Sequence, residues 1–153
     1  MKLLVLNGPN LNLLGVREPG LYGTVDYQGL LELIQKKCDE LGVEVRFYQS
    51  NHEGDLVDAI QEARFDCDGI VINPGAYTHT SVAILDALKA VALPAAEVHI
   101  TDVTKREPFR QISYAGMACQ GRFIGQGLQG YLNAVDFLIE TVQKNKEYPV
   151  TGK

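Results

Sequence analysis

The stretch Leu3-Leu4-Val5-Leu6-Asn7-Gly8-Pro9-Asn10 begins as a short apolar strand and continues into turn-forming residues. The same order recurs at Gly69-Ile70-Val71-Ile72, which is followed directly by Asn73-Pro74-Gly75. A continuous apolar run bounded by turn residues is typical of a strand buried on both faces of a parallel sheet. The polar residues that end both strands predict a ligand site where these two strands end.

Outward from these two strands, apolar β-rich runs alternate with segments of helical periodicity. Further strands are expected at 43–48, at 95–100 and around 123–124, and helices at 27–41, 56–63, 81–91 and 131–142. This alternation predicts a parallel sheet with helices on both faces. Five strands suit the flavodoxin-like order 2-1-3-4-5, with a ligand crevice between the first and third strands. We therefore expect one doubly wound α/β domain over residues 1–153.

The composition narrows the class of protein. The chain has 153 residues, 46% hydrophobic and 22% charged, which is enough to bury a core without a disulfide or a metal. No apolar run approaches the ~20 residues of a membrane span, and we expect no signal peptide. The three cysteines form no CxxC pair, which favours a reducing, cytoplasmic location and a core-packing role for Cys38. The net charge of −5 argues against a nucleic-acid partner.

The loop from Asn7 to Gly23 is long for a connection and contains Arg17 and Tyr22. Long loops after the first strand of α/β proteins often carry ligand sites. An arginine close to a tyrosine favours the phenolate, which can then act as a base near neutral pH. The alternative is an ordinary loop aromatic beside a solvated charge, and the pair taken alone favours that alternative.

The strand expected at 95–100 contains Glu97 and His99, which strand alternation places on the same face. In a sheet covered on both sides, a buried glutamate and histidine are costly unless they are paired. They could form a satisfied structural pair. Their position at the carboxyl end of an interior strand favours a functional pair, in which Glu97 sets the tautomer of His99 and His99 is a general acid.

Two loops near these strands have two interpretations each. The segment 73–81 could supply only turn and cap chemistry, or it could direct Asn73 and His79 into the crevice. The segment 101–110 could be a solvated loop, or its Lys105, Arg106 and Arg110 could hold an anionic ligand. An anion bound by a chain of this negative net charge would need such local arginines.

One glycine pattern resembles a dinucleotide fingerprint. Gly125-Gln126-Gly127-Leu128-Gln129-Gly130 matches GxGxxG, but no further strand ending in an acid follows ~20 residues later. We therefore predict a tight turn and close helix–sheet packing here.

Taken in order, these segments resemble the type II 3-dehydroquinate dehydratases over nearly the whole chain. The motifs that carry the resemblance are Asn7-Gly8-Pro9-Asn10-Leu11, Leu14-Gly15, Arg17-Glu18-Pro19, Tyr22-Gly23, Gln49-Ser50-Asn51-His52-Glu53-Gly54, the segment 73–81, Glu97-Val98-His99 and Arg106-Glu107-Pro108-Phe109-Arg110. The family is flavodoxin-like and cofactor-free, and its members assemble as dodecamers built from trimers. The resemblance implies a lyase that eliminates water from 3-dehydroquinate through an enolate to give 3-dehydroshikimate, in the shikimate pathway of aromatic amino acid biosynthesis or in quinate breakdown.

The resemblance also implies the catalytic roles. Tyr22 would be the base, held as a phenolate by Arg17 on a mobile lid. Asn10 would hold a water that stabilises the enolate. His99 would be the acid, oriented by Glu97.

Substrate binding follows from the same resemblance. Asn73 and the backbone amides of Ile100 and Thr101 would bind the substrate carboxylate. The other expected contacts are those of His79 and Arg110 with ring hydroxyls, of Asp86 with the neighbouring subunit's site, and of Arg106 with the lid or the interface.

One position departs from the family pattern, because many members have Ser-Asn where this chain has Thr101-Asp102. Thr101 keeps its amide and hydroxyl, whereas Asp102 adds a negative charge close to an anionic substrate. Two other classes of function stay open: a module that binds a nucleotide or a small anion without catalysis, and a scaffold whose oligomer is its function. The paired Glu97 and His99 argue against the first, and the intact catalytic set argues against the second.

Overall fold

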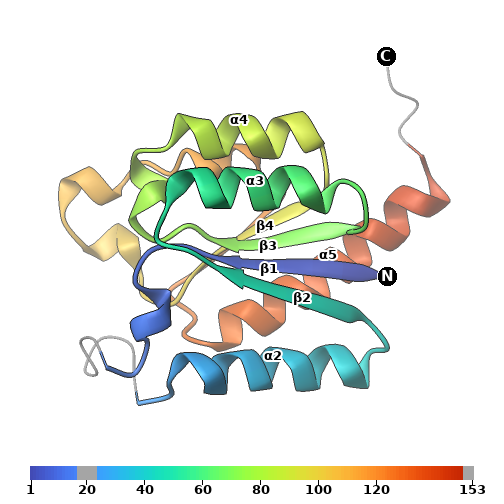
Figure 1. Ribbon diagram of the computed structural model, residues 1–153, viewed down its shortest axis with the longest axis horizontal. Coiled ribbons are helices and arrows are strands. Elements are labelled where there is room, and N and C mark those ends of the chain that lie inside the picture. Colours follow the sequence, from blue (N-terminus) through green and yellow to red (C-terminus); the bar gives the residue numbers. More distant parts are fainter. Residues whose placement is uncertain (17–23, 150–153) are drawn as a thin grey trace.

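The computed structural model describes residues 1–16 and 24–149, which contain one five-stranded parallel sheet in the order β2-β1-β3-β4-β5 (Figure 1). The strands are β1 (Lys2–Asn7), β2 (Glu44–Gln49), β3 (Gly69–Asn73), β4 (Ala95–His99) and β5 (Gly121–Ile124). The predicted α/β class and strand order are confirmed.

In the described part of the chain, four α-helices cover the two faces of this sheet (Figure 1). They are α2 (Tyr27–Glu40), α3 (Glu53–Ala63), α4 (Val82–Val91) and α5 (Gln129–Glu147). The side chain of Asp26 caps α2 and that of Ser81 caps α4. Helix α3 begins three residues before the predicted helix, because its polar first turn carries no apolar periodicity. None of the helices in the described ranges is both long and apolar enough to cross a membrane.

Alternate residues of β1 belong to two separate cores. Leu3 and Val5 pack with residues of α2 and α5, whereas Leu4 and Leu6 pack with residues of α3 and α4. All four side chains are fully buried, as expected for an interior strand of a doubly covered sheet. Cys38 of α2 is fully buried in the first core, which confirms its predicted packing role.

All three cysteine thiols have raised pKa values. Burial raises the pKa of Cys38 to about 11, and burial with the charge of Glu97 raises that of Cys119 to about 12. Burial also raises the pKa of Cys67. All three side chains are therefore neutral thiols near neutral pH.

The loops that follow β1 and β3 touch each other. Asn7 and Asn73 are register partners at the ends of these strands. A Cβ added to Gly8 would lie 2.3 Å from the carbonyl oxygen of Pro74, so only glycine fits at this contact. The Gly8 amide donates a hydrogen bond to the Asn73 carbonyl at 2.8 Å. The two neighbouring strands thus hold their two loops in a fixed relation.

The glycine-rich segment before α5 is a tight turn, as predicted. Gly125 and Gly127 have φ of 75° and 61°, which L side chains rarely adopt. Their amides donate hydrogen bonds to the carbonyls of His99 and Ile100, both at 3.0 Å. A Cβ on Gly130 would meet Val98 at 3.4 Å, so α5 packs closely on β4. The turn therefore fixes the backbone where β4 ends.

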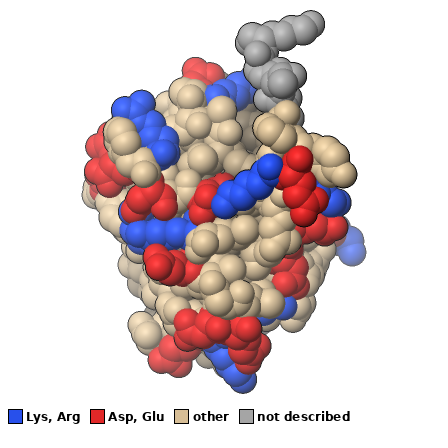
Figure 2. Space-filling view, turned by 90° about the vertical axis from the view of Figure 1, so that its right-hand side faces the viewer, with Lys and Arg blue, Asp and Glu red and all other residues tan. Residues whose placement is uncertain are grey.

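The strands begin at the end of the molecule that lies opposite their carboxyl ends, and this end carries interspersed basic and acidic side chains (Figure 2). Ion pairs there join Lys2 and Arg46 to Asp66, at 2.9 and 2.8 Å, and Lys146 to Asp68 at 3.5 Å. Such partly exposed pairs contribute little to stability. This end therefore offers mixed charge rather than a basic surface.

Candidate active site

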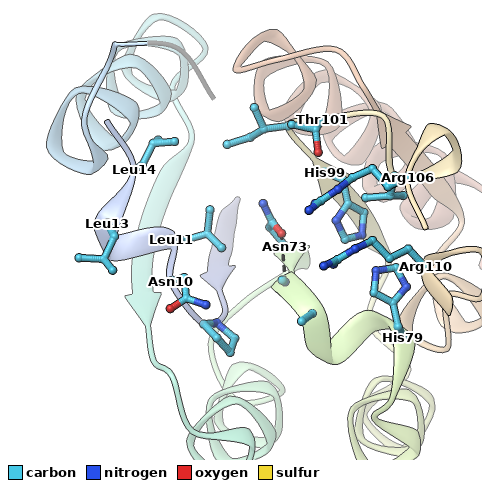
Figure 3. A pocket seen from close by; sticks show the side chains of 15 residues that line it. Asn10, Leu11, Leu13, Leu14, Asn73, His79, His99, Thr101, Arg106 and Arg110 are labelled. Carbon is cyan, nitrogen blue, oxygen red and sulfur yellow. Dashed lines mark hydrogen bonds between the residues drawn. The ribbon is translucent and has the colours of Figure 1, made fainter. Parts of the chain in front are cut away.

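A cleft lies at the carboxyl ends of β1, β3 and β4 (Figure 3). One wall is the short helix η1 (Leu11–Leu13) with Leu14, which presents apolar side chains. The other wall combines η2 (Gly75–His79) with the loop after β4, which contains η3 (Val103–Lys105) and η4 (Pro108–Arg110). This second wall carries imidazole and guanidinium groups, and Asn73 lies between the two walls. An apolar face opposite a cationic face suits a small anion with a carbon ring.

Most of the predicted site residues meet in this cleft. Its lining includes Asn10, Asn73, His79, His99, Ile100, Thr101, Arg106 and Arg110. Glu97 lies directly behind His99 and is fully buried. Asp86 is exposed on α4 and does not line this chain's own cleft within the described residues. The predicted base Tyr22 and its partner Arg17 lie outside the described residues.

Asn10 is held at the edge of the cleft by its backbone. Its φ is 70°, in the left-handed region that asparagine tolerates better than most side chains. Its amide donates to Asn51 Oδ1 at 3.0 Å, which ties η1 to the loop after β2. These backbone constraints place Asn10 in the lining of the cleft.

Glu97 and His99 form the buried pair that the alternation of β4 predicts. His99 Nε2 lies 2.8 Å from Glu97 Oε1. Burial alone would raise the pKa of Glu97, but the hydrogen bond and charge of His99, together with two hydroxyl groups, lower it to about 2. The carboxylate is therefore ionised and can only accept, so Nε2 carries a proton. His99 Nδ1 is left to exchange a proton with a ligand.

Three further contacts of Glu97 were not predicted. Thr78 Oγ1 and Ser113 Oγ donate to Oε1, and Arg122 Nε donates to Oε2 at 2.7 Å. Arg122 is the register partner of Glu97 on β5, so strand pairing could have indicated this ion pair. The two hydroxyls come from loops, and no periodicity in the sequence marks them.

Asn73 belongs to a buried polar network under the cleft. Its Nδ2 donates to the hydroxyl of Tyr131 at 2.9 Å, and that hydroxyl donates to Asn7 Oδ1 at 2.7 Å. Asn73 Oδ1 accepts from the Gly75 amide at 3.1 Å. Burial raises the pKa of Tyr131, which keeps the phenol protonated. One Nδ2 proton of Asn73 remains for a ligand.

The positive charge of the cleft comes from Arg106 and Arg110, whose side chains point into it (Figure 3). Both guanidinium groups share a single acid: Glu107 Oε2 lies 2.7 Å from Arg110 Nε and 3.9 Å from Arg106 Nε. Among the residues that the structure describes, these two cations and one carboxylate leave a net positive charge, which favours an anionic ligand.

His79 supplies a neutral polar group beside them. Its Nδ1 lies 2.8 Å from the carbonyl of Ile112, and its ring stacks near that of His99 with centroids 6.3 Å apart. Burial lowers the pKa of His79, although the bond to Ile112 opposes this shift. The neutral ring donates from Nδ1 to the carbonyl, and Nε2 can accept a hydrogen bond from a ligand.

Asp102 does not bring its charge into the cleft lining. Its Oδ1 accepts from the Thr104 amide at 3.0 Å and from the Thr104 hydroxyl, and its Oδ2 lies 3.8 Å from Lys105 Nζ. The Thr104 hydroxyl is the main cause of its lowered pKa. Within 1–16 and 24–149, no three His, Cys, Asp or Glu side chains gather where they could hold a metal ion.

The family model, the similar sequences and the similar solved structures all indicate the same protein family. The family model described as "Dehydroquinase class II" matches residues 1–139. The chain is 53% identical over 146 residues to the 3-dehydroquinate dehydratase of Lachnospira eligens, which covers 94% of this chain and 99% of that protein. It is also 53% identical over 140 residues to the enzyme of that name from Caldicellulosiruptor bescii, covering 91% and 97%. The crystal structure of type II dehydroquinase from Butyrivibrio crossotus superposes with a TM-score of 0.89 at 54% identity, covering 91% and 97% of the two chains.

Proposed function

The chain belongs to the dehydroquinase class II family, which makes it a hydro-lyase, and we propose that its cleft dehydrates 3-dehydroquinate with Tyr22 as base and His99 as acid. The observation that carries this proposal is the buried Glu97–His99 pair, which faces a cleft with two arginines. The substrate is a carboxylate on a carbon ring, which suits a cleft with one apolar and one cationic wall.

The reaction needs two proton transfers and a stabilised oxyanion. A base removes the proton on C2, next to the ketone, and the electrons move into an enolate. The C1 hydroxyl then takes a proton, leaves as water, and the C1–C2 double bond forms. Tyr22, held as a phenolate by Arg17, takes the first proton, and a water held by Asn10 donates a hydrogen bond to the enolate.

His99 gives the second proton from Nδ1. Its Nε2–H bond to Glu97 at 2.8 Å keeps the ring oriented, and the ionised carboxylate stabilises the imidazolium that must exist before the transfer. After the transfer, His99 is a neutral ring with its proton on Nε2.

Binding of the substrate carboxylate draws on the end of β4. Asn73 offers its remaining Nδ2 proton, and the amides of Ile100 and Thr101 offer two more. The peptide groups here are fixed because Gly125 and Gly127 hold the carbonyls of His99 and Ile100. Preset donors of this kind bind an anion without reorganisation. His79 and Arg110 would hold ring hydroxyls, and Arg106 would support the lid or the interface.

We expect a dodecamer built from trimers, in which Asp86, exposed on α4, reaches the site of a neighbouring copy. The expected location is the cytoplasm, and the expected role is aromatic biosynthesis or quinate breakdown.

The test is direct. Purified protein is mixed with 3-dehydroquinate without added metal or nucleotide, and the ultraviolet absorbance of the conjugated enone product is followed. Tyr22→Phe and Arg17→Ala should each lower turnover by roughly a hundredfold or more, as expected for loss of a general base. Far-ultraviolet circular dichroism of both variants should match that of the wild type. Near-normal turnover in either variant would contradict the assigned base, and no absorbance rise with folded wild-type protein would remove the proposed reaction.

A further inference from the structure

One oxygen of the buried carboxylate receives an unusual number of donors. Glu97 Oε1 accepts from the hydroxyls of Thr78 and Ser113, both at 2.5 Å, and from His99 Nε2 at 2.8 Å. The other oxygen accepts from Arg122. Both oxygens of the Glu97 carboxylate are thus held by hydrogen bonds from protein donors.

The two hydroxyls come from two different loops, which follow β3 and β4. Thr78 lies on η2 and is fully buried, whereas Ser113 follows η4 and also accepts from the Gly116 amide at 2.9 Å. Their oxygens are 2.9 Å apart. Each hydroxyl has one proton to give, and both protons have Oε1 as an acceptor. The loops after β3 and after β4 therefore meet at this single atom.

A carboxylate rotates easily about its last carbon–carbon bond unless contacts prevent it, because that torsion has no sharp minima. The hydrogen bond from His99 Nε2 to Glu97 keeps the imidazole ring in one orientation, provided that Oε1 stays in place. A shifted Oε1 would turn the imidazole, and with it Nδ1, away from the substrate. A displacement of about 1 Å at such a point can cost roughly a hundredfold in rate.

We propose that Thr78 and Ser113 are positioning residues, whose hydroxyls fix the Glu97 carboxylate and thereby aim the acid His99. The inference rests on the proposed dehydration, because it concerns the acid of that reaction. Neither Thr78 nor Ser113 lines the described part of the cleft, so substrate binding does not depend on them. Their removal should change kcat and leave KM nearly unaltered.

Thr78→Val is the main variant, because valine has the shape of threonine without the hydroxyl. A buried hydrogen bond to a charged group is lost, so kcat should fall by roughly tenfold to a hundredfold. KM should stay within about threefold of the wild type, as for loss of an interaction used only in the chemical step. Thr78→Ser keeps the hydroxyl and should restore most of kcat. Thr80→Val is the matched control, since Thr80 is exposed two residues away, and it should behave as the wild type.

A second variant guards against misfolding of Thr78→Val, and an NMR measurement tests the position of His99 without using turnover. Ser113→Ala carries the test if Thr78→Val fails to fold. Nitrogen-15 NMR of the histidine rings is recorded on the free protein at a pH where the rings are neutral, and His99→Gln assigns the signals. Wild-type His99 should show a single tautomer, protonated on Nε2. The two variants should show a mixture of tautomers.

The two tests separate the inference from the proposed function. An inactive wild type would remove the dehydration, while the NMR comparison would still report on the positioning. The inference is overturned by wild-type kcat in Thr78→Val or Ser113→Ala, by a change in KM alone, by failure of Thr78→Ser to recover kcat, or by unchanged ring-nitrogen spectra.

Discussion

The partners that keep Glu97 ionised link the stability of the fold to pH. Its pKa is about 2 in the folded protein against an ordinary value of 4.5. The unfolded chain therefore binds more protons than the native chain between these values, so stability rises with pH across this window. At ~1.4 kcal/mol for each pKa unit, Glu97 contributes roughly 3 kcal/mol above pH 4.5, and this contribution is lost as the pH falls toward 2.

Glu97→Gln should remove that part of the pH dependence. Urea unfolding at a series of pH values should give a shallower slope of the unfolding free energy for Glu97→Gln than for the wild type. Glu140→Gln is the control, because Glu140 is a largely exposed acid paired with Lys144 on α5. Equal slopes in all three proteins would mean that Glu97 is not held ionised by its partners.

Asp102 gives a second prediction for a single residue. Its carboxylate is occupied by Thr104 and Lys105, so Asp102→Asn should change KM for 3-dehydroquinate by no more than about twofold, as for a surface charge. Arg110→Ala, which removes a cation from the cleft, should raise KM by roughly tenfold or more. The KM values of both variants and of the wild type are measured by steady-state kinetics at the same ionic strength. A large drop in KM for Asp102→Asn would show that its charge repels the substrate.

At the scale of elements, the contact between the loops after β1 and β3 decides the shape of the cleft. Gly8→Ala would place a Cβ 2.3 Å from the Pro74 carbonyl oxygen, so the loops after β1 and β3 must separate. We expect the unfolding free energy to fall by about 1–3 kcal/mol, and turnover should fall with it.

Gly54→Ala is the matched control for this change. Gly54 lies in the first turn of α3, and a Cβ added to it would meet nothing within 4 Å. Alanine there should leave stability unchanged or raise it by about 0.5–1 kcal/mol, because it favours the helix. Urea unfolding and the absorbance assay measure both variants. If Gly8→Ala matched Gly54→Ala in stability and turnover, the loop contact would not matter for the site.

The elements also show what the sequence could and could not predict. The strands and the Glu97–His99 pair follow from short-range patterns, because side-chain alternation acts between neighbours in the chain. The strand order was instead predicted from the number of alternating strand–helix units. The donors Thr78 and Ser113 could not be predicted, since a single sequence does not say which loop hydroxyl meets a buried carboxylate. The start of α3 was missed for a related reason, because polar first turns carry no apolar signal.

At the scale of the whole molecule, the position of Asp86 makes the assembly testable. Asp86 is exposed on α4 and does not line the described part of its own cleft, so any role in the site needs a second copy. Light scattering of the wild type should give the mass of a dodecamer. Asp86→Ala should keep that mass and lower kcat/KM by roughly tenfold, as for a lost charged contact.

Asp136→Ala serves as the control, because Asp136 is half exposed and pairs with Lys37 on the other face of the sheet. It should keep both mass and activity. A monomeric wild type with full activity would contradict the expected role of Asp86 and the assembly together.

The low reactivity of the three cysteines has a practical consequence for fluorescent labelling of this enzyme. Alkylating dyes attack thiolates, and Cys38, Cys67 and Cys119 all have raised pKa values and little or limited exposure. A cysteine introduced at an exposed position such as Val16, on the edge of the cleft loop, would therefore react first. The natural chain can thus accept a single fluorescent reporter near its cleft without prior removal of its own cysteines.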